Sequence, residues 1–351
     1  MGKLNKFFSK KKIFITGHTG FKGSWLTETL INFGSFVKGY SLKDEKKSFY
    51  ESFVNFRKVK NSYGDISDYK KLKNEIESFK PSIIFHLAAQ PLVIDSYKDP
   101  HTTFKSNCGG LINLLNIVHN SNFVKSLVII TSDKCYKIKK EQIKSFKEND
   151  ELGGYDPYSA SKAAAEIITF PYVHILGSRG VGVATARAGN VIGGGDFSKN
   201  RIIPDCYRAL NKKFLILRNP LSVRPWQHIL DVVNGYLILS MNLYKRRKKF
   251  SGAWNFGPLQ KNKSVKNLVD SFNQNLKKRI KIKVSSNRKN KLKETSSLNL
   301  DSKKSNKYLK WQTRIDFMKG VNLTAEWYEN YLYNKAGKKI TSSQIKHFFK
   351  L

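Results

Sequence analysis

The sequence has few cysteines and few acidic side chains, and it has no long apolar segment. Its 351 residues include only three cysteines, Cys108, Cys135 and Cys206. An odd number of widely spaced cysteines argues against a disulfide framework and against a CxxC metal or redox site. A membrane-spanning helix needs about 20 apolar residues, and no apolar run approaches that length. The lysine-rich first residues leave no room for the apolar core of a secretory signal. We therefore expect a metal-free protein of the reducing cytoplasm, without a membrane partner.

Acidic residues are outnumbered by basic ones, 26 against 64, which gives a formal net charge of +38. A charge of this size suggests binding to a polyanion. The lysines are scattered through almost every segment, however, and no signature of a DNA-binding or RNA-binding fold is present. We attribute the charge to overall composition and expect no nucleic-acid partner. A non-catalytic basic protein that holds a polyanion is the alternative from a different functional class.

Apolar runs alternate with helical patterns through the first half of the chain, which is typical of βα units around a parallel sheet. Strands are expected over residues 12–17, 35–41, 59–67, 82–89, 126–132 and 180–190. Helices are expected over residues 23–33, 68–79, 106–122 and 157–170. The pattern predicts an α/β fold, a Rossmann-type doubly wound parallel sheet with a smaller, discontinuous C-terminal substrate domain.

The alternation ends after about residue 188, where the loops GGGD, RNP and RPWQ begin. A chain of this length suits about two domains. We expect the Rossmann domain to comprise residues 1–187 and to be rejoined by about 226–256, including a late strand at 253–258. The second domain is then 188–225 and 257–335, and residues 336–351 form a solvated basic tail.

A glycine-rich turn, TGHTGFKG, lies directly between the first strand and the first helix. Gly17, Gly20 and Gly23 permit a tight turn and let the backbone approach a pyrophosphate, while the helix N-terminus presents amides to negative charge. In this strand–turn–helix setting the spacing predicts a dinucleotide site. His18 and Lys22 either lie near the phosphates or face water.

The second strand lacks the acidic residue that usually binds the adenosine ribose in NAD enzymes. It ends in YSL at residues 40–42, and Asp44 follows slightly late. No arginine follows directly to hold a 2′-phosphate, which favours NAD over NADP. Asp65 and Ile66, after the third strand, either meet the adenine edge or form an ordinary turn.

Tyr158 and Lys162 stand four residues apart on one predicted helix, so that an ammonium and a phenol share a face. A free tyrosine has a pKa near about 10, and lowering it by about three units takes about 4 kcal/mol, which a nearby cation helps to supply. After a glycine turn and a strand ending in TSD, this pair predicts a general base.

Several further motifs lie along the chain: TGHTGFKGSWL, HLAAQPLV, TSDKCY, LGGYDPYSASKAAAE, ARAGNVIGGGDF, RIIPD, RNP and RPWQH. Together they resemble, over roughly residues 11–330, the extended short-chain dehydrogenase/reductases and, among them, the CDP-glucose 4,6-dehydratases. The resemblance implies NAD-dependent conversion of CDP-D-glucose to CDP-4-dehydro-6-deoxy-D-glucose and water. It also implies a homodimer or a higher homo-oligomer.

The resemblance implies a role for each matched residue. Tyr158 takes the proton of the sugar C4 hydroxyl, and Lys162 lowers its pKa and binds the nicotinamide ribose. Thr131 holds the phenol by a hydrogen bond, with Ser132 beside it, and Asp133 protonates the C6 hydroxyl as it leaves. The implied cofactor contacts are Gly17, His18, Thr19, Gly20, Phe21, Lys22, Gly23, Asp65, Ile66, Leu87, Ala88, Ala89, Tyr158 and Lys162.

Lys134 departs from the dTDP-glucose relatives, which have a glutamate at this position as the C5 base. A lysine with a pKa near about 10.4 is a poor base unless burial or positive neighbours lower that pKa. Lys134 is therefore either the base or a cation that stabilises the enolate. The nearest alternatives are a 4-epimerase and dTDP- or GDP-sugar dehydratases. A 4-epimerase needs no acid at C6, so the pair of Asp133 and Lys134 argues against an epimerase.

The implied substrate contacts are polar side chains in loops. Arginine suits a diphosphate through its rigid fork of donors. The expected residues are Arg201, Arg218 and Arg224 for the nucleotide diphosphate, Gln90 and Asn190 for the sugar and phosphate, and Asn107 as a support of the active site. We expect no metal ligands.

Overall fold

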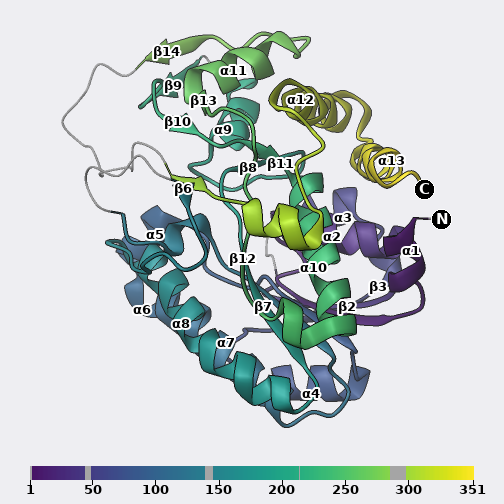
Figure 1. Cartoon of the computed structure of the whole chain (residues 1–351). Coiled ribbons are helices and arrows are strands. Elements are labelled where there is room, and N and C mark those ends of the chain that lie inside the picture. The colour runs from purple at the N-terminus through teal and green to yellow at the C-terminus, as the bar shows by residue number, and fades with distance from the viewer. Residues whose placement is uncertain (1, 44–48, 139–144, 213, 285–297) are drawn as a thin grey trace.

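The computed structural model describes residues 2–43, 49–138, 145–212, 214–284 and 298–351. Its central feature is a seven-stranded sheet in which every neighbouring pair is parallel. The strands are β1 (Lys12–Thr16), β2 (Phe36–Ser41), β3 (Val59–Tyr63), β4 (Ile83–His86), β5 (Ser126–Ile130), β7 (Gly182–Arg187) and β12 (Gly252–Asn255), in the order β12-β7-β5-β4-β1-β2-β3. The α/β prediction is confirmed, and β12 rejoins the sheet beside β7 as expected (Figure 1).

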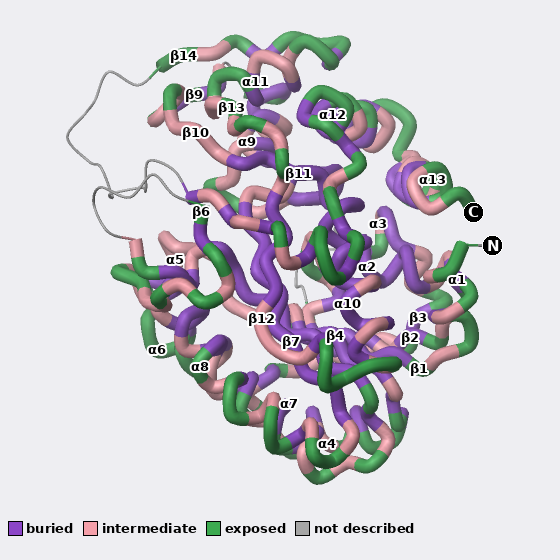
Figure 2. Tube along the Cα trace, viewed as in Figure 1, coloured by how far each residue is buried: buried purple, intermediate pink, exposed green. Residues whose placement is uncertain are grey.

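Helices cover both faces of this sheet because successive strand residues point to opposite sides. Ile13 and Ile15 belong to a core shared with α2 (Phe21–Asn32) and α10 (Ile229–Phe250), whereas Phe14 belongs to the core on the other face. That second core is completed by α4 (Tyr69–Phe79), α7 (Gly110–His119) and α8 (Pro157–Ser178). Figure 2 shows the buried strands between the two helical layers.

The order of the strands reverses at β1, which has β2 on one side and β4 on the other. Thr16 at the end of β1 pairs with His86 at the end of β4, so the two carboxyl ends are level. The turns that follow these ends lead to helices in the cores on opposite faces, α2 on one side and α7 on the other, and parallel sheets bind ligands at such a reversal of strand order. The fold therefore positions a ligand site beside the glycine turn.

The remaining elements are short or belong to the C-terminal half. Two-stranded pairs are formed by β8 (Val191–Ile192) with β11 (Gln227–His228), β9 (Leu215–Leu217) with β14 (Ile282–Val284), β10 (Val223–Arg224) with β13 (Lys263–Ser264), and β6 (Ser145–Phe146) with β15 (Asn299–Leu300). The other helices are α1 (Lys3–Phe8), α3 (Phe49–Phe53), α5 (Val93–Lys98), α6 (Pro100–Phe104), α9 (Ile202–Ala209), α11 (Val265–Gln274), α12 (Phe317–Asn334) and α13 (Gly337–Phe349), with single turns at Phe56–Lys58, Lys105–Gly109, Asp133–Cys135 and Ser305–Leu309. None of the described helices is long and apolar enough to cross a membrane.

Helix α8 runs to Ser178, beyond the expected end at residue 170, although it contains Pro171. Proline removes one helical hydrogen bond and usually breaks a helix interior. The extension buries Leu176 completely and packs Val173 against the second core. Apolar packing of the extra turns therefore outweighs the local cost of the proline.

The expectation of a solvated tail after residue 335 is wrong, because α13 packs against α2 and α3. Its buried residues, Thr341, Gln344 and Ile345, recur at helical spacing, and lysines occupy the opposite face. The indole nitrogen of Trp327 donates a hydrogen bond to the Thr341 hydroxyl at 2.8 Å. The high lysine content concealed this amphipathic pattern.

Replacing Ile345 tests whether α13 is part of the core. Ile345 is fully buried, so Ile345→Ala is expected to lower the free energy of unfolding by about 2–4 kcal/mol, measured by urea denaturation. Lys346→Ala, at the exposed neighbouring position, is the matched control and is expected to leave the midpoint unchanged. Equal midpoints for both variants would show that the segment is a solvated tail.

Candidate active site

The glycine turn connects β1 to α2 without room for larger residues. Gly17 has a positive φ of 71°, and a Cβ there would lie 2.7 Å from the backbone nitrogen of Ala88. A Cβ at Gly23 would overlap the Gly17 carbonyl. No side chain caps the start of α2 at Gly20, so the first amides of the helix are left for a ligand. A close backbone turn with amides at a helix N-terminus fits a dinucleotide pyrophosphate.

His18 does not face the phosphate position. Its ring is fully buried, and Nε2 lies 3.1 Å from Oδ1 of Asn61. The ring packs edge-on against Tyr50, in space that Gly39 leaves open. Burial lowers the pKa of His18 to about 4, so the imidazole is neutral at pH 7. The His18 side chain is therefore buried within the protein and does not face water, as one of the two expectations had it.

The residues expected near the adenosine form turns at the ends of β2 and β3. The Asp65 carboxylate accepts a hydrogen bond from the Ser67 amide at 2.8 Å, as in an ordinary Asx turn. Ile66 is buried against Gly110. The Thr19 hydroxyl donates to the Ser41 hydroxyl at 3.0 Å and so joins the glycine turn to β2. Asp44 lies outside the described residues.

The turn after β4 lies directly beside the glycine turn. The Ala88 amide donates to the Thr16 hydroxyl at 3.2 Å, and the same hydroxyl lies 2.7 Å from Nδ1 of His86. Burial lowers the pKa of His86 to about 3, which keeps this ring neutral. Leu87 and Ala89, the other two expected contacts in this turn, are half-buried.

Tyr158 and Lys162 lie in the first turns of α8, where Asp156 caps the helix. The Tyr158 amide donates to the Ser96 hydroxyl at 3.1 Å, and the phenol is 9% exposed. Lys162 is 7% exposed, and its Nζ donates to the carbonyl of Ile130, the last residue of β5, at 3.2 Å. The predicted pair is thus buried at the carboxyl end of the sheet.

Burial shifts both groups toward their neutral forms. It raises the pKa of Tyr158 to about 12, and a hydrogen bond with Ser132 is the largest effect that lowers it. The pKa of Lys162 is lowered to about 8 by burial, with the Glu166 carboxylate as the largest opposing effect. The expected lowering of the phenol pKa by Lys162 is not among the leading effects in this structure.

The hydroxyl beside the phenol belongs to Ser132, so the prediction that Thr131 holds Tyr158 is wrong. The Thr131 hydroxyl donates instead to Oε1 of Glu166 at 2.5 Å. The chain is extended at this point, so consecutive side chains point to opposite sides. The Ser132 hydroxyl lies on the side of the phenol and donates to Oδ1 of Asp133 at 2.9 Å.

Asp133 is 5% exposed, and its carboxylate packs against Gly189, where a Cβ would overlap the carboxylate oxygens. Lys134 is half-buried, and its amide donates to the Ser132 hydroxyl at 3.2 Å. The charge of Asp133 also acts on the Lys22 ammonium. Burial, followed by the positive charge of Arg201, lowers the pKa of Lys22 to about 8, and Asp133 opposes this shift.

Gln90 and Asn107 use their side chains within the protein. The Gln90 amide group bonds the Leu92 backbone and donates to the Thr103 hydroxyl at 2.9 Å. Asn107 accepts from the Gln90 backbone at 2.8 Å and donates to the Ser161 hydroxyl on α8, also at 2.8 Å. Asn107 thus joins the Gln90 backbone to α8, and the Gln90 side chain bonds within its own loop.

The expected substrate arginines lie in the C-terminal half. Arg201 precedes α9 and pairs with Asp196 at 3.1 Å, near enough to Tyr158 to act on its pKa. Arg218 is exposed after β9, and Arg224 on β10 donates to the Val223 carbonyl at 2.9 Å. Asn190 adopts a left-handed backbone conformation, with φ of 45°, in the loop after β7.

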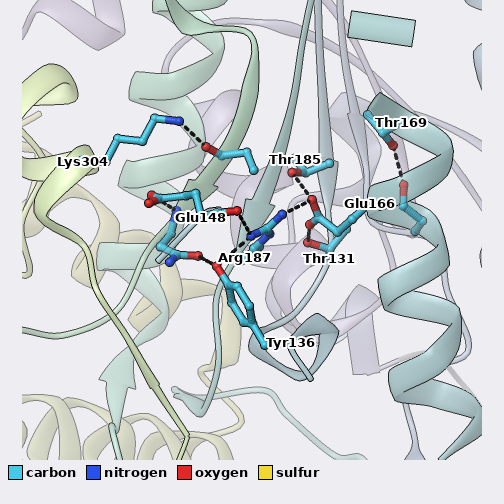
Figure 3. A network of polar contacts seen from close by, with 11 residues as sticks. Thr131, Tyr136, Glu148, Glu166, Thr169, Thr185, Arg187 and Lys304 are labelled. Atoms are coloured by element: carbon cyan, nitrogen blue, oxygen red, sulfur yellow. Dashed lines mark hydrogen bonds and ion pairs between the residues drawn. The ribbon is translucent and has the colours of Figure 1, made fainter. Parts of the chain in front are cut away.

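Sequence reasoning missed a buried pair behind the active site, Glu166 on α8 and Arg187 on β7. Their side chains are 3% exposed and 2.7 Å apart (Figure 3). Both lie inside motifs that had been singled out, YSASKAAAE and ARAGN. A glutamate in an alanine-rich helix, four residues after Lys162, was the available signal. The described residues contain no cluster of three or more acidic, histidine or cysteine side chains that could hold a metal ion.

The family model for GDP-mannose 4,6 dehydratase matches residues 14–324. A CDP-glucose 4,6-dehydratase of Salmonella typhimurium is 45% identical over 76% of this chain and 76% of its own length. A human dTDP-D-glucose 4,6-dehydratase is 24% identical over 92% and 91% of the two chains.

Among solved structures, a UDP-glucose 4-epimerase of Thermotoga maritima has a TM-score of 0.79 at 21% identity, with 92% and 99% of the chains covered. A dTDP-glucose 4,6-dehydratase of Bacillus anthracis in complex with NAD has a TM-score of 0.74 at 22% identity, with 92% and 98% covered. The chain belongs to the GDP-mannose 4,6 dehydratase family, within the extended short-chain dehydrogenase/reductases.

Proposed function

We propose that the protein is a lyase that converts CDP-D-glucose to CDP-4-dehydro-6-deoxy-D-glucose and water. The 45% identity to a CDP-glucose 4,6-dehydratase supports the substrate and the reaction. The observation that carries the chemistry is the buried Asp133 carboxyl beside Ser132 and Tyr158. A 4-epimerase has no step that uses an acid at this place, whereas a dehydratase must protonate the departing C6 hydroxyl.

The proposed cofactor is NAD, which, when bound, would supply hydride acceptance at C4 and hydride donation at C6. The amides at the start of α2 and the close turn at Gly17, Gly20 and Gly23 hold the pyrophosphate. Lys162 holds the nicotinamide ribose. The remainder of the proposed site is lined by residues of the glycine turn and of the turns after β3 and β4: Thr19, Phe21, Lys22, Asp65, Ile66, Leu87, Ala88 and Ala89. The NAD complex of a dehydratase with the same fold supports this choice.

Tyr158 takes the proton of the C4 hydroxyl, helped by the Ser132 hydrogen bond that lowers the pKa of the phenol. Oxidation at C4 makes the C5 proton acidic because the new ketone stabilises the enolate. Asp133 then gives its proton to the C6 hydroxyl, which leaves as water. Lys134 acts on C5 either as the base or as a cation beside the enolate.

We propose the division of labour between two domains that the sequence suggested. Residues 1–187, with about 226–256, bind the cofactor, and 188–225 with 257–335 bind the nucleotide sugar. Arg201, Arg218 and Arg224 hold the diphosphate, with Asn190 near the sugar. Arg201 is well placed for this because it lies near both Tyr158 and Lys22.

We also propose a cytoplasmic location and a homo-oligomer. The three cysteines are all free thiols, which suits a reducing compartment. Two apolar side chains on α8, Ile167 and Phe170, are 61% and 69% exposed, which supports contact with a second copy.

Incubation with four nucleotide sugars tests the proposed function. The purified protein, given CDP-, dTDP-, UDP- and GDP-glucose with NAD, is expected to convert CDP-glucose to a product lighter by one water, without net NADH production. Mass spectrometry of the products measures this. Appearance of epimers of unchanged mass would favour the epimerase alternative, and salt-sensitive retention on nucleic acid without turnover would favour a polyanion-binding protein.

Tyr158→Phe removes the proton acceptor and keeps the ring. The rate of product formation is expected to fall by at least about 10²-fold, with the calorimetric affinity for CDP-glucose little changed. Tyr155→Phe, at a tyrosine that is 87% exposed, is the matched control and is expected to retain the full rate. A near-normal rate in the Tyr158 variant would remove this residue from the mechanism.

Asp133→Asn separates oxidation from elimination. Oxidation at C4 depends on Tyr158 and Lys162, so it is expected to persist while elimination slows by roughly 10²–10⁴-fold. Reduced nicotinamide should accumulate in a single turnover and be visible by its absorbance. Asp270→Asn, on the surface of α11, is the control. Failure of the folded Asp133 variant to form any reduced nicotinamide would move the acid role to another residue.

A further inference from the structure

We infer that Glu166 is a positioning residue for this reaction: its buried carboxylate ties the strands that carry Asp133 and Asn190 to the helix that carries Tyr158 and Lys162. This inference rests on the proposed function for the step that it affects, the oxidation at C4. It concerns a residue that acts through others, since the carboxylate of Glu166 is bonded to Thr131, Thr185 and Arg187 and not to Tyr158 or Asp133.

Three donors converge on the Glu166 carboxylate (Figure 3). The Thr131 hydroxyl donates to Oε1 at 2.5 Å. The Thr185 hydroxyl and Nη2 of Arg187 donate to Oε2 at 2.6 and 2.7 Å. Each donor is buried, so the carboxylate is paired and well satisfied, which a charge at 3% exposure requires.

Each of these contacts leads directly to the reaction centre. Thr131 is followed by Ser132, which bonds the phenol and Asp133. Arg187 is followed, two residues later, by Gly189, against which the Asp133 carboxylate packs. Glu166 itself lies one helical turn after Lys162. One carboxylate thus joins the ends of β5 and β7 to α8.

Arg187 extends the network to the C-terminal half of the chain. Its Nη1 donates to the Tyr136 hydroxyl at 2.7 Å and to the Glu148 carbonyl at 2.9 Å. The Tyr136 hydroxyl donates in turn to Oδ1 of Asn255, at the end of β12, at 2.7 Å. The guanidinium is therefore fixed from several sides, and it holds the glutamate in one orientation.

The charge of Glu166 also keeps Lys162 protonated. Burial lowers the pKa of Lys162 to about 8, and Glu166 is the largest effect that raises it. The charged forms of Cys108 and Cys135 would also raise the pKa of Lys162. The Lys162 ammonium in turn lowers the pKa of Lys22 and of His86. Loss of the glutamate charge is therefore expected to release the lysine proton at lower pH.

Glu166→Gln tests this inference because it keeps the shape and removes the charge. Reduced nicotinamide formed in a single turnover is followed against pH, with whichever of the four nucleotide-glucoses the wild type oxidises. We expect the alkaline decline of the rate to move to lower pH by about one pH unit. We also expect kcat to fall by roughly 10-fold to 100-fold, with KM and the calorimetric affinity for the sugar nucleotide within about 2-fold of the wild type.

Two further variants serve as rescue and control. Glu166→Asp keeps the charge, so its alkaline limb is expected to stay at the wild-type pH. Thr169→Val removes another buried hydroxyl of α8, one that donates to the Ala165 carbonyl at 2.7 Å, and should leave the kinetics unchanged. Should Glu166→Gln fail to fold because Arg187 is left unpaired, the double variant Glu166→Gln with Arg187→Gln removes both charges and is expected to give the same shift.

A folded Glu166→Gln protein with the wild-type alkaline limb would overturn the inference, even if its melting temperature were lower. The same holds for the double variant if it alone folds. Failure of the wild type to dehydrate CDP-glucose would instead refute the proposed substrate, since each comparison between variant and wild type is made on the sugar that the wild type oxidises.

Discussion

The close contact of α2 with the end of β1 is the constraint on which the rest of the structure depends. Gly17 turns the chain with a left-handed backbone, and Gly23 lets the first turn of the helix lie against it. Trp25 on this helix then reaches the loop after β8, where its indole nitrogen donates to the Gly194 carbonyl at 2.8 Å. The same contact that shapes the proposed pyrophosphate site therefore also connects the sheet to the C-terminal half of the chain.

Buried charge is the second organising feature, in a protein whose acidic residues are scarce. Several of its few carboxylates lie inside, among them Asp133, Glu166, Asp196 and Asp231. Each has polar partners, because an unpaired buried charge is costly. The Asp231 carboxylate, for example, accepts the amides of Arg314 and Ile315 at 2.8 and 3.1 Å and so anchors the approach to α12. Among the described residues the buried charged side chains are six acidic and two basic, so the large positive net charge is a property of the surface.

The sheet was predictable from the sequence because its strands are short apolar runs bounded by turns, and such runs are local features. The return of β12 to the sheet was predictable for the same reason, although its partner β7 lies far away in sequence. Helix α13 was not, since abundant lysines hid an apolar face that only the surfaces of α2 and α3 reveal. Pro171 led to an expected helix end at residue 170, whereas α8 continues to Ser178, because packing against residues distant in sequence decides whether a helix continues.

Local spacing by itself determined the glycine turn, the pairing of Tyr158 with Lys162 on one helix face and the position of Asp133 after a strand. Only the tertiary structure decided that the Ser132 hydroxyl bonds the phenol of Tyr158, while the neighbouring Thr131 hydroxyl bonds Glu166. It also decided that His18 is buried and that the charges of Lys22 and Asp133 interact. The physical reason is that spacing along the chain sets which residues share an element, whereas the direction and the protonation of a side chain depend on neighbours brought from elsewhere in the sequence.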